Sequence, residues 1–172
     1  MTAEPIRIDH AALGEILATE DEILGFPGLP GFPEARRFVV RQHDRDSVFG
    51  WLVCLELPDL AFPVTDPWSF VPDYAPPFGP HHWRAVDHRE GDPVQVLAIA
   101  RLVDGAVDLN LAAPVLIDLR SRRGLQAILE TDRYACRTRV LEAGAEVVRS
   151  NRSPRETEAT EAPARDRSAP PE

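Results

Sequence analysis

The chain contains no lysine, and only two of its 172 residues are cysteine. The absence of lysine fits the codon bias of a GC-rich genome and excludes no mechanism. Cys54 and Cys136 cannot form a disulfide framework, and their separation matches no zinc-finger or zinc-ribbon spacing. No apolar run approaches the roughly 18 residues that span a bilayer, and the N-terminus lacks the pattern of a signal peptide. We therefore expect a cytoplasmic protein with reduced thiols and no membrane partner.

Positive charge is scarce as well. Nineteen basic residues face 28 acidic ones, so the formal net charge is −9. A chain of this charge repels a phosphate backbone, and we expect no direct nucleic-acid binding; any role of RNA would run through another protein. Residues 1–34 hold seven carboxylates and a single arginine. This imbalance predicts one markedly negative end of the fold.

Helical periodicity is weak, and alternation of apolar and polar residues dominates. In residues 107–119 the apolar side chains share one parity, whereas Asp108, Asn110 and Asp118 fall on the other, as in a half-buried strand. Similar patterns predict strands in residues 37–42, 48–57, 94–103 and 125–130. Asp104 and Gly105 form a two-residue hairpin signal between two of these runs. Short helical turns are expected only at residues 34–37 and 82–88.

Two proline-rich segments complete the fold prediction. Residues 58–80 contain seven prolines, which exclude a helix interior and favour an extended segment that crosses the sheet. Pro114 is expected to bend its strand or to sit where a missing N–H is harmless. Residues 141–172 are polar and proline-rich, without aromatic residues, and predict a disordered tail. The fold class we expect is mainly β: a small barrel or barrel-like sandwich spanning residues 1–140, with little helix.

Residues with catalytic potential are few. His81, His82 and His88, together with Asp87, could converge on a metal ion in a small metal-dependent hydrolase; the alternative is a set of surface histidines on a charged turn. Cys54 lies in an apolar strand, where a small buried side chain is expected in place of a nucleophile. We therefore expect no enzyme activity, no cofactor and no bound metal.

The segment FPGLPGF, residues 26–32, combines rigid and flexible backbone. Gly28, Pro30, Gly31 and Phe32 predict a tight turn whose apolar side chains dock on the core. A ligand-binding loop is the alternative interpretation, although the glycine spacing is not that of a phosphate loop.

Three blocks of sequence carry a family resemblance. GLPGF at residues 28–32, WLVCLELPDLAFPVTDPWSFVPDY at residues 51–74 and NLAAPVLIDLRSRRGLQAIL at residues 110–129 occur in the order and spacing of the bacterial flagellar assembly factor FliW family. The resemblance covers about residues 5–137. The chain departs from the usual pattern of the family in four places. These are a shortened FPGLPGF turn, Pro63 in place of an aliphatic residue, the unusual stretch PPFGPHHWRAVDHREGD and the additional tail.

The resemblance implies a β protein that is not an enzyme and that binds two polypeptides. FliW-like proteins bind the RNA-binding translational repressor CsrA and also flagellin, so that secretion of flagellin frees them to take CsrA off flagellin mRNA. A module that binds flagellin alone is the alternative.

Four residues are candidates for partner contact. Phe70, Asp73 and Tyr74 end the aromatic stretch of the crossing segment, where a carboxylate and an amphipathic ring could be presented together. Packing of Tyr74 within a capped turn is the alternative. Asn110 lies on the polar parity of its strand and could bind an added peptide strand, or bond internally to a neighbouring loop.

Overall fold

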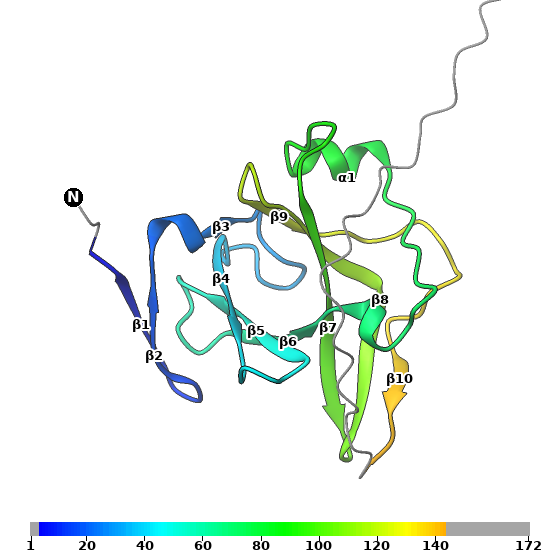
Figure 1. Cartoon of the computed structure of the whole chain (residues 1–172), viewed down its shortest axis with the longest axis horizontal. Helices are drawn as coiled ribbons and strands as arrows, with labels where there is room; N and C mark the ends of the chain where they lie inside the picture. The colour runs from blue at the N-terminus through cyan, green and yellow to red at the C-terminus, as the bar shows by residue number, and fades with distance from the viewer. Residues whose placement is uncertain (1–3, 144–172) are drawn as a thin grey trace, which may run out of the picture.

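The computed structural model of the protein describes residues 4–143, and the predicted tail therefore lies almost entirely outside the described residues. Figure 1 shows a strand-rich body, and residues 4–143 contain one short α-helix, which lies near one end. No helix in the described part of the chain is long and apolar enough to cross a membrane. In chain order the elements are β1 (Ile6–His10), β2 (Gly14–Ala18), η1 (Glu20–Glu22), β3 (Leu24–Gly25), β4 (Arg37–Gln42), β5 (Phe49–Cys54), β6 (Ala61–Thr65), η2 (Pro67–Ser69), α1 (Pro80–Ala85), β7 (Val94–Val103), β8 (Ala106–Asp118), β9 (Arg123–Gln126) and β10 (Thr138–Leu141).

Strands β3 to β9 form a closed barrel. Around the ring the order is β8-β7-β6-β5-β4-β3-β9, and a second pairing joins β9 back to β8. Neighbouring strands run antiparallel apart from β3 and β9, which pair in parallel at Gly25 and Arg123. β10 lies outside the ring on the free edge of β8. The predicted fold class, a mainly β barrel with little helix, is confirmed.

A separate hairpin covers one side of the barrel. β1 and β2 form a two-stranded sheet of their own, which lies beside β4 in Figure 1. The inner face of the hairpin places Ile8 and Ile16 in one buried cluster with Val39 of β4 and Val53 of β5. The opposite parity of β4 and β5, including Phe38, Leu52 and Cys54, faces the barrel interior. Both faces of these strands are therefore buried, which is why β4 and β5 have near-continuous apolar sequences.

The β7–β8 hairpin follows the sequence prediction closely. Asp104 and Gly105 form the two-residue turn, both with positive φ, and Val103 pairs with Ala106 on either side. Near Pro114 the register of β7 with β8 shifts, because Leu97 pairs with Val115 whereas Ile99 pairs with Asn110. Residues 111–114 of β8 therefore have no paired residue in β7 and form a bulge. Pro114 lies in this bulge, so no hydrogen bond to β7 is lost through its missing N–H. Of the two alternatives expected for Pro114, the structure shows the second, a position in the ladder where its missing N–H is harmless.

Two local expectations were wrong. β8 is buried on both faces in its second half, so Asp118, predicted on an exposed face, is completely buried. The cause is the pairing of β7 with the end of β8, together with the loop between α1 and β7, which places Val86 against Ser121 and His88 against Asp118. The helical turn expected at residues 34–37 is absent from the described structure, because Arg37 already begins β4.

The proline-rich segment crosses the outside of the barrel as predicted, after contributing one short strand. β6 tolerates Pro63 because β6 pairs with β7 only at Val64 and Thr65, so no ladder bond to β7 is required from Pro63. Beyond β6 the chain passes through η2 and runs beside β8 to α1, as Figure 1 shows.

Candidate partner-binding surface

The crossing segment is fixed to the barrel by Tyr74. The Tyr74 hydroxyl donates a hydrogen bond to the backbone carbonyl of Leu111 in β8 at 2.8 Å, and only 3% of the residue is exposed. The indole Nε1 of Trp68 in turn donates to the Tyr74 carbonyl at 2.8 Å. Burial, and next the neighbouring Tyr134, raise the pKa of the Tyr74 hydroxyl, which therefore remains a donor. Tyr74 is thus packed in a turn, as the alternative interpretation of the sequence had it.

Tyr134 closes the other side of this turn. Its ring meets Tyr74 edge to face at 4.7 Å, and its hydroxyl accepts a hydrogen bond from the backbone N–H of Ala75 at 2.9 Å. Two aromatic side chains, Trp68 and Tyr134, therefore hold residues 74–75 between them. The result is a segment that is rich in proline, bonded at both sides and rigid before any partner arrives.

The remaining candidate residues lie around this anchor. Phe70 is half-buried against Phe49 of β5, with ring centroids 5.6 Å apart, and Asp73 is exposed. Asn110 is half-buried and precedes Leu111 in β8. The hydrogen bond between Tyr74 and Leu111 therefore brings the crossing segment close to Asn110. The Oδ1 atom of Asn110 accepts an internal hydrogen bond from the N–H of Ala113 at 3.0 Å. Within the described residues, the Nδ2 donor of Asn110 makes no hydrogen bond.

The FPGLPGF segment forms a closed corner. Leu29 and Phe32 exchange two backbone hydrogen bonds of 3.0 and 2.8 Å across Pro30 and Gly31. Gly28 has a φ of 112°, and a Cβ there would lie 2.8 Å from the Pro33 carbonyl oxygen. Leu29 is buried in the barrel core, and Phe32 packs edge to face on Phe62. This geometry is that of a structural turn, closed by the two backbone hydrogen bonds between Leu29 and Phe32.

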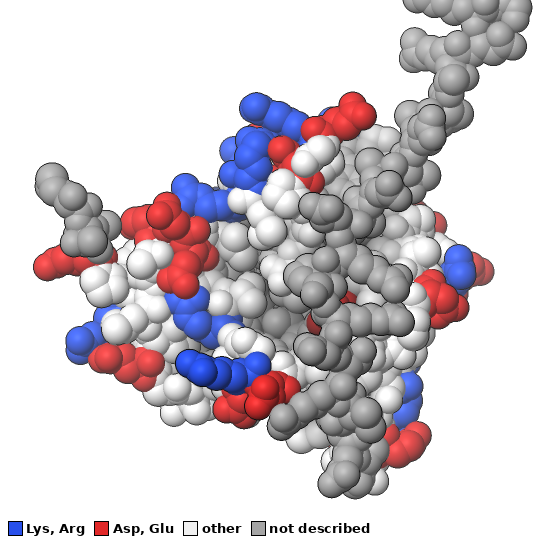
Figure 2. Space-filling view, viewed as in Figure 1, with Lys and Arg blue, Asp and Glu red and all other residues white. Residues whose placement is uncertain are grey.

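The acidic residues of the N-terminal part of the chain lie in and around η1. Figure 2 shows acidic side chains grouped on this side of the molecule with basic ones beside them. Glu22 lies 3.1 Å from Arg41 and Asp21 lies 3.3 Å from Arg122, while Glu15 pairs with Arg7 across the β1–β2 hairpin. The negative charge predicted for this end is therefore partly neutralised by neighbours that are distant in sequence.

The histidines do not converge as a metal site at residues 81–88. His82 is buried and uses both ring nitrogens on backbone groups, with Nδ1 accepting from the Gly79 N–H at 3.0 Å and Nε2 3.2 Å from the Ile128 carbonyl. Burial, and next the neighbouring His81, lower the pKa of His82. His81 is exposed, and Asp87 pairs with Arg120. His82 thus joins α1 to the chain after β9.

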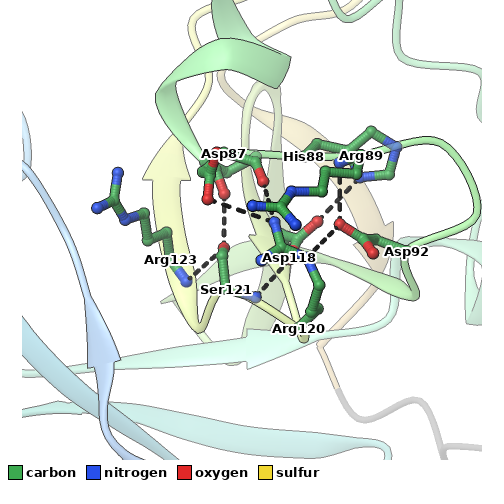
Figure 3. Close-up of polar contacts among 9 residues, drawn as sticks. Asp87, His88, Arg89, Asp92, Asp118, Arg120, Ser121 and Arg123 are labelled. Carbon is green, nitrogen blue, oxygen red and sulfur yellow. Dashed lines mark hydrogen bonds and ion pairs between the residues drawn. The ribbon is translucent and has the colours of Figure 1, made fainter.

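His88 instead belongs to a polar cluster that sequence reasoning missed. Its Nδ1 atom lies 2.9 Å from Oδ2 of Asp118, the fully buried carboxylate at the end of β8. Asp92 accepts a hydrogen bond from Nε of Arg120 at 2.6 Å, which lowers the pKa of Asp92. Figure 3 shows His88, Asp92, Asp118 and Arg120 directed toward one another, whereas Arg123 points away. Asp118 follows His88 by 30 positions, and the pairing of Val94 with Asp118 helps to bring them together.

Cys54 is a core side chain. It is completely buried within the barrel cluster, and burial raises the pKa of its thiol. A nucleophilic thiolate requires the opposite shift. The sequence prediction of a small buried residue is confirmed.

Comparisons with known proteins agree with one another. A family model described as "FliW protein" matches residues 7–140. "Flagellar assembly factor FliW" of Ruminiclostridium cellulolyticum is 33% identical over 133 residues, which cover 75% of this chain and 90% of the relative. The protein of the same description from Thermosipho africanus is 31% identical over 137 residues, covering 77% and 94%. A solved structure described as "Crystal structure of the flagellar assembly factor FliW" superposes with a TM-score of 0.75 at 28% identity, covering 80% of this chain and 98% of that chain.

Proposed function

Because this chain belongs to the FliW family of flagellar assembly factors, we propose that it works by binding two polypeptides, a CsrA-type RNA-binding regulator and flagellin. In this proposal the protein acts in the cytoplasm as a chaperone and sensor. While flagellin is abundant, the protein is occupied; once flagellin is secreted, the free protein binds the regulator and relieves its repression of flagellin mRNA. No catalysis and no direct contact with RNA are involved.

The observation that carries this proposal is the immobilised crossing segment. Pro-rich backbone, the Tyr74–Leu111 hydrogen bond and the Tyr134 contact fix residues 70–75 in the free protein. A surface that is rigid before binding loses little conformational entropy when a partner docks. Phe70 and Asp73 present an apolar edge and a carboxylate on this surface, and Asn110 offers its Nδ2 donor from the adjoining strand. Tyr74, being buried, supports the surface from beneath.

The charge of the chain favours the same kind of partner. A net charge of −9 attracts a basic RNA-binding protein over long range and repels RNA at the same time. An acidic protein docked on such a regulator also opposes RNA binding electrostatically. The proposal therefore needs no overlap between the RNA surface of the regulator and the docking surface.

Binding measured separately for each partner tests the proposal. Purified full-length protein is titrated with the CsrA-type regulator and with flagellin of the same organism by calorimetry. Asp73→Arg removes the exposed carboxylate, and Asn110→Asp keeps the acceptor used by Ala113 while removing the Nδ2 donor. We expect each variant to weaken at least one of the two complexes by roughly tenfold, about 1.4 kcal/mol.

Asp59→Arg is the matched control, since Asp59 is exposed in the turn between β5 and β6. It should leave both affinities within about twofold of the wild-type values. Loss of binding by Asp59→Arg but not by Asp73→Arg would show that the docking surface is not the crossing segment around Asp73. Flagellin binding without any regulator binding would reduce the function to a flagellin-only module, and binding of neither would overturn the proposal.

A further inference from the structure

We propose that His88, Asp92 and Asp118 form a binding site for a divalent transition-metal ion of the Zn²⁺ class. One ligand atom from each of the three side chains lies within 4.8 Å of the others, and the described residues hold one group of this kind. A nitrogen and two carboxylate oxygens form a donor set that zinc accepts in proteins, with a fourth position left for water. The site stands apart from the crossing segment, and the inference is independent of the proposed function.

The barrel holds the three donors in place. Asp118 ends β8 and pairs with Val94, and the Leu119 N–H donates to the Pro93 carbonyl at 2.9 Å. This hydrogen bond joins the residue after Asp92 to the residue after Asp118, so it holds the two carboxylates near each other. His88 is packed on the Trp83 ring of α1 with a centroid separation of 4.7 Å. Donors at about 2.0–2.2 Å from a zinc ion require side-chain shifts of only about 1 Å from this arrangement.

Hydrogen bonds around the cluster orient the donors without using all of their lone pairs. The Ser121 N–H donates to Oδ1 of Asp118 at 2.8 Å, and the Arg89 N–H donates to Oδ2 of Asp92 at 2.9 Å. Such bonds from outside fix the angle at which a carboxylate meets an ion. In the described part of the chain, Oδ1 of Asp92 carries no hydrogen bond and retains its lone pairs. The ring nitrogen that faces Asp118 is Nδ1 of His88, at 2.9 Å from Oδ2. Nδ1 becomes a donor to the ion in the tautomer that carries its proton on Nε2, and the ion then replaces the hydrogen bond between His88 and Asp118.

Arg120 is the cation that an incoming metal ion must displace. Its guanidinium neutralises Asp92 and also bonds to Asp87 through the backbone carbonyl and the side chain, as Figure 3 shows. When a dication binds Asp92 and Asp118, Arg120 keeps its contacts with Asp87. Arg120 therefore sets the affinity: its positive charge opposes the ion, whereas removing it leaves two carboxylates near one another without a counter-charge.

The test uses full-length protein freed of metal with a chelator. Zn²⁺ and Co²⁺ should raise the melting temperature at micromolar concentrations, and Co²⁺ should give the visible absorption bands of a low-coordinate N/O site. Mg²⁺ should do neither, because it prefers an octahedral shell of oxygen ligands. His88→Ala and Asp92→Asn should each abolish both signals. Arg120→Gln should lower the melting temperature without metal but tighten Co²⁺ binding, by roughly tenfold.

His81→Ala and Asp59→Asn are the controls, since both residues are exposed and outside the cluster. They should leave the Co²⁺ spectrum and the affinity unchanged. The proposal is overturned if Zn²⁺ and Co²⁺ have no effect, if His88→Ala retains the spectrum, or if Arg120→Gln weakens binding. Folding of the variants is checked by circular dichroism, and Asp92→Asn, which keeps the size of the side chain, carries the test if His88→Ala unfolds.

Discussion

Tyr74 and Leu111 are 37 positions apart in the chain, and their hydroxyl and carbonyl oxygens lie 2.8 Å from each other inside the protein. This bond joins the middle of the crossing segment to the longest strand of the barrel. Because the hydroxyl is buried, no water can replace it when it is removed. The Tyr74 hydroxyl is therefore the buried part of the attachment of the proposed docking surface, beside the contacts made by Tyr134 and Phe70.

Replacing Tyr74 tests this attachment. Tyr74→Phe leaves the Leu111 carbonyl without its donor and should lower the free energy of unfolding by about 1–2 kcal/mol. Tyr74→Ala, which also leaves a cavity, should cost about 3–5 kcal/mol. Urea unfolding measures both changes. Tyr134→Phe is the control and should cost less, because Tyr134 is half-exposed and water can reach the Ala75 N–H. Equal effects of the two Tyr→Phe changes would contradict this ranking.

His82 should make the protein less stable in mild acid. Its Nδ1 accepts the Gly79 N–H only when unprotonated, and burial lowers its folded pKa below the ordinary 6.5. Above pH 6.5 both the folded and unfolded states hold His82 neutral, and stability is full. As pH falls below 6.5 the unfolded state takes up a proton first, so the free energy of unfolding decreases until the folded pKa is reached.

Urea unfolding between pH 5 and pH 7.5 measures this dependence. His82→Gln should flatten the curve in this window, whereas His81→Ala should leave most of the slope in place because His81 is exposed. A wild-type curve that is level from pH 7.5 to pH 5 would show that His82 protonates without cost to the fold.

Glu56 should control stability at a lower pH. Burial alone would raise its pKa, but the Arg37 guanidinium and the backbone N–H groups of Arg37 and Arg36 lower it to about 2. The stabilisation is present above the ordinary value of 4.5 and is lost as pH falls from 4.5 toward 2. Glu56→Gln should remove this dependence and cost about 1 kcal/mol at neutral pH, since Arg37 is largely exposed.

Acid titration of the wild type and of Glu56→Gln, followed by circular dichroism, gives the comparison. Glu34→Gln is a suitable control because Glu34 is an exposed glutamate near the same strand. An unchanged acid midpoint in Glu56→Gln would mean that other carboxylates dominate acid unfolding.

Charge reversal at η1 should change association more than stability. Glu20→Arg combined with Asp21→Arg reverses two exposed charges, while Glu22 is left in place because it accepts the Thr19 N–H and pairs with Arg41. We expect the on-rate with the basic regulator to fall several-fold at low salt, with a nearly unchanged melting temperature. Stopped-flow binding at two salt concentrations measures this. On-rates that respond neither to the variant nor to salt would refute electrostatic steering.

Local sequence patterns predicted the elements that depend on near neighbours. Alternation identified β8, apolar strand-like runs identified β4 and β7, the Asp104–Gly105 pair identified the hairpin, and proline density identified the crossing segment. These features are decided by backbone sterics and side-chain period, which act over a few residues. The family resemblance, carried by three blocks of motif, anticipated the barrel, and the comparisons then showed the family.

Long-range pairings were outside the reach of the same reasoning. Asp118 was predicted to be exposed because its parity in the strand is polar, yet β7 and the loop between α1 and β7 cover the strand there. Its meeting with His88 depends on the β7–β8 register, which the histidine spacing does not contain. Tyr74 illustrates the same limit, since the sequence shows an amphipathic ring but not the carbonyl that receives its hydroxyl.

The parallel contact of Gly25 with Arg123 has a consequence for synthesis of the protein. Since the first strand of the ring pairs with the last, the barrel cannot close until almost the entire described chain has left the ribosome. Nascent chains therefore emerge with an open sheet edge, and such topologies fold slowly. A newly made molecule therefore completes its barrel only after translation has passed β9, which sets a minimum delay between synthesis and the finished fold.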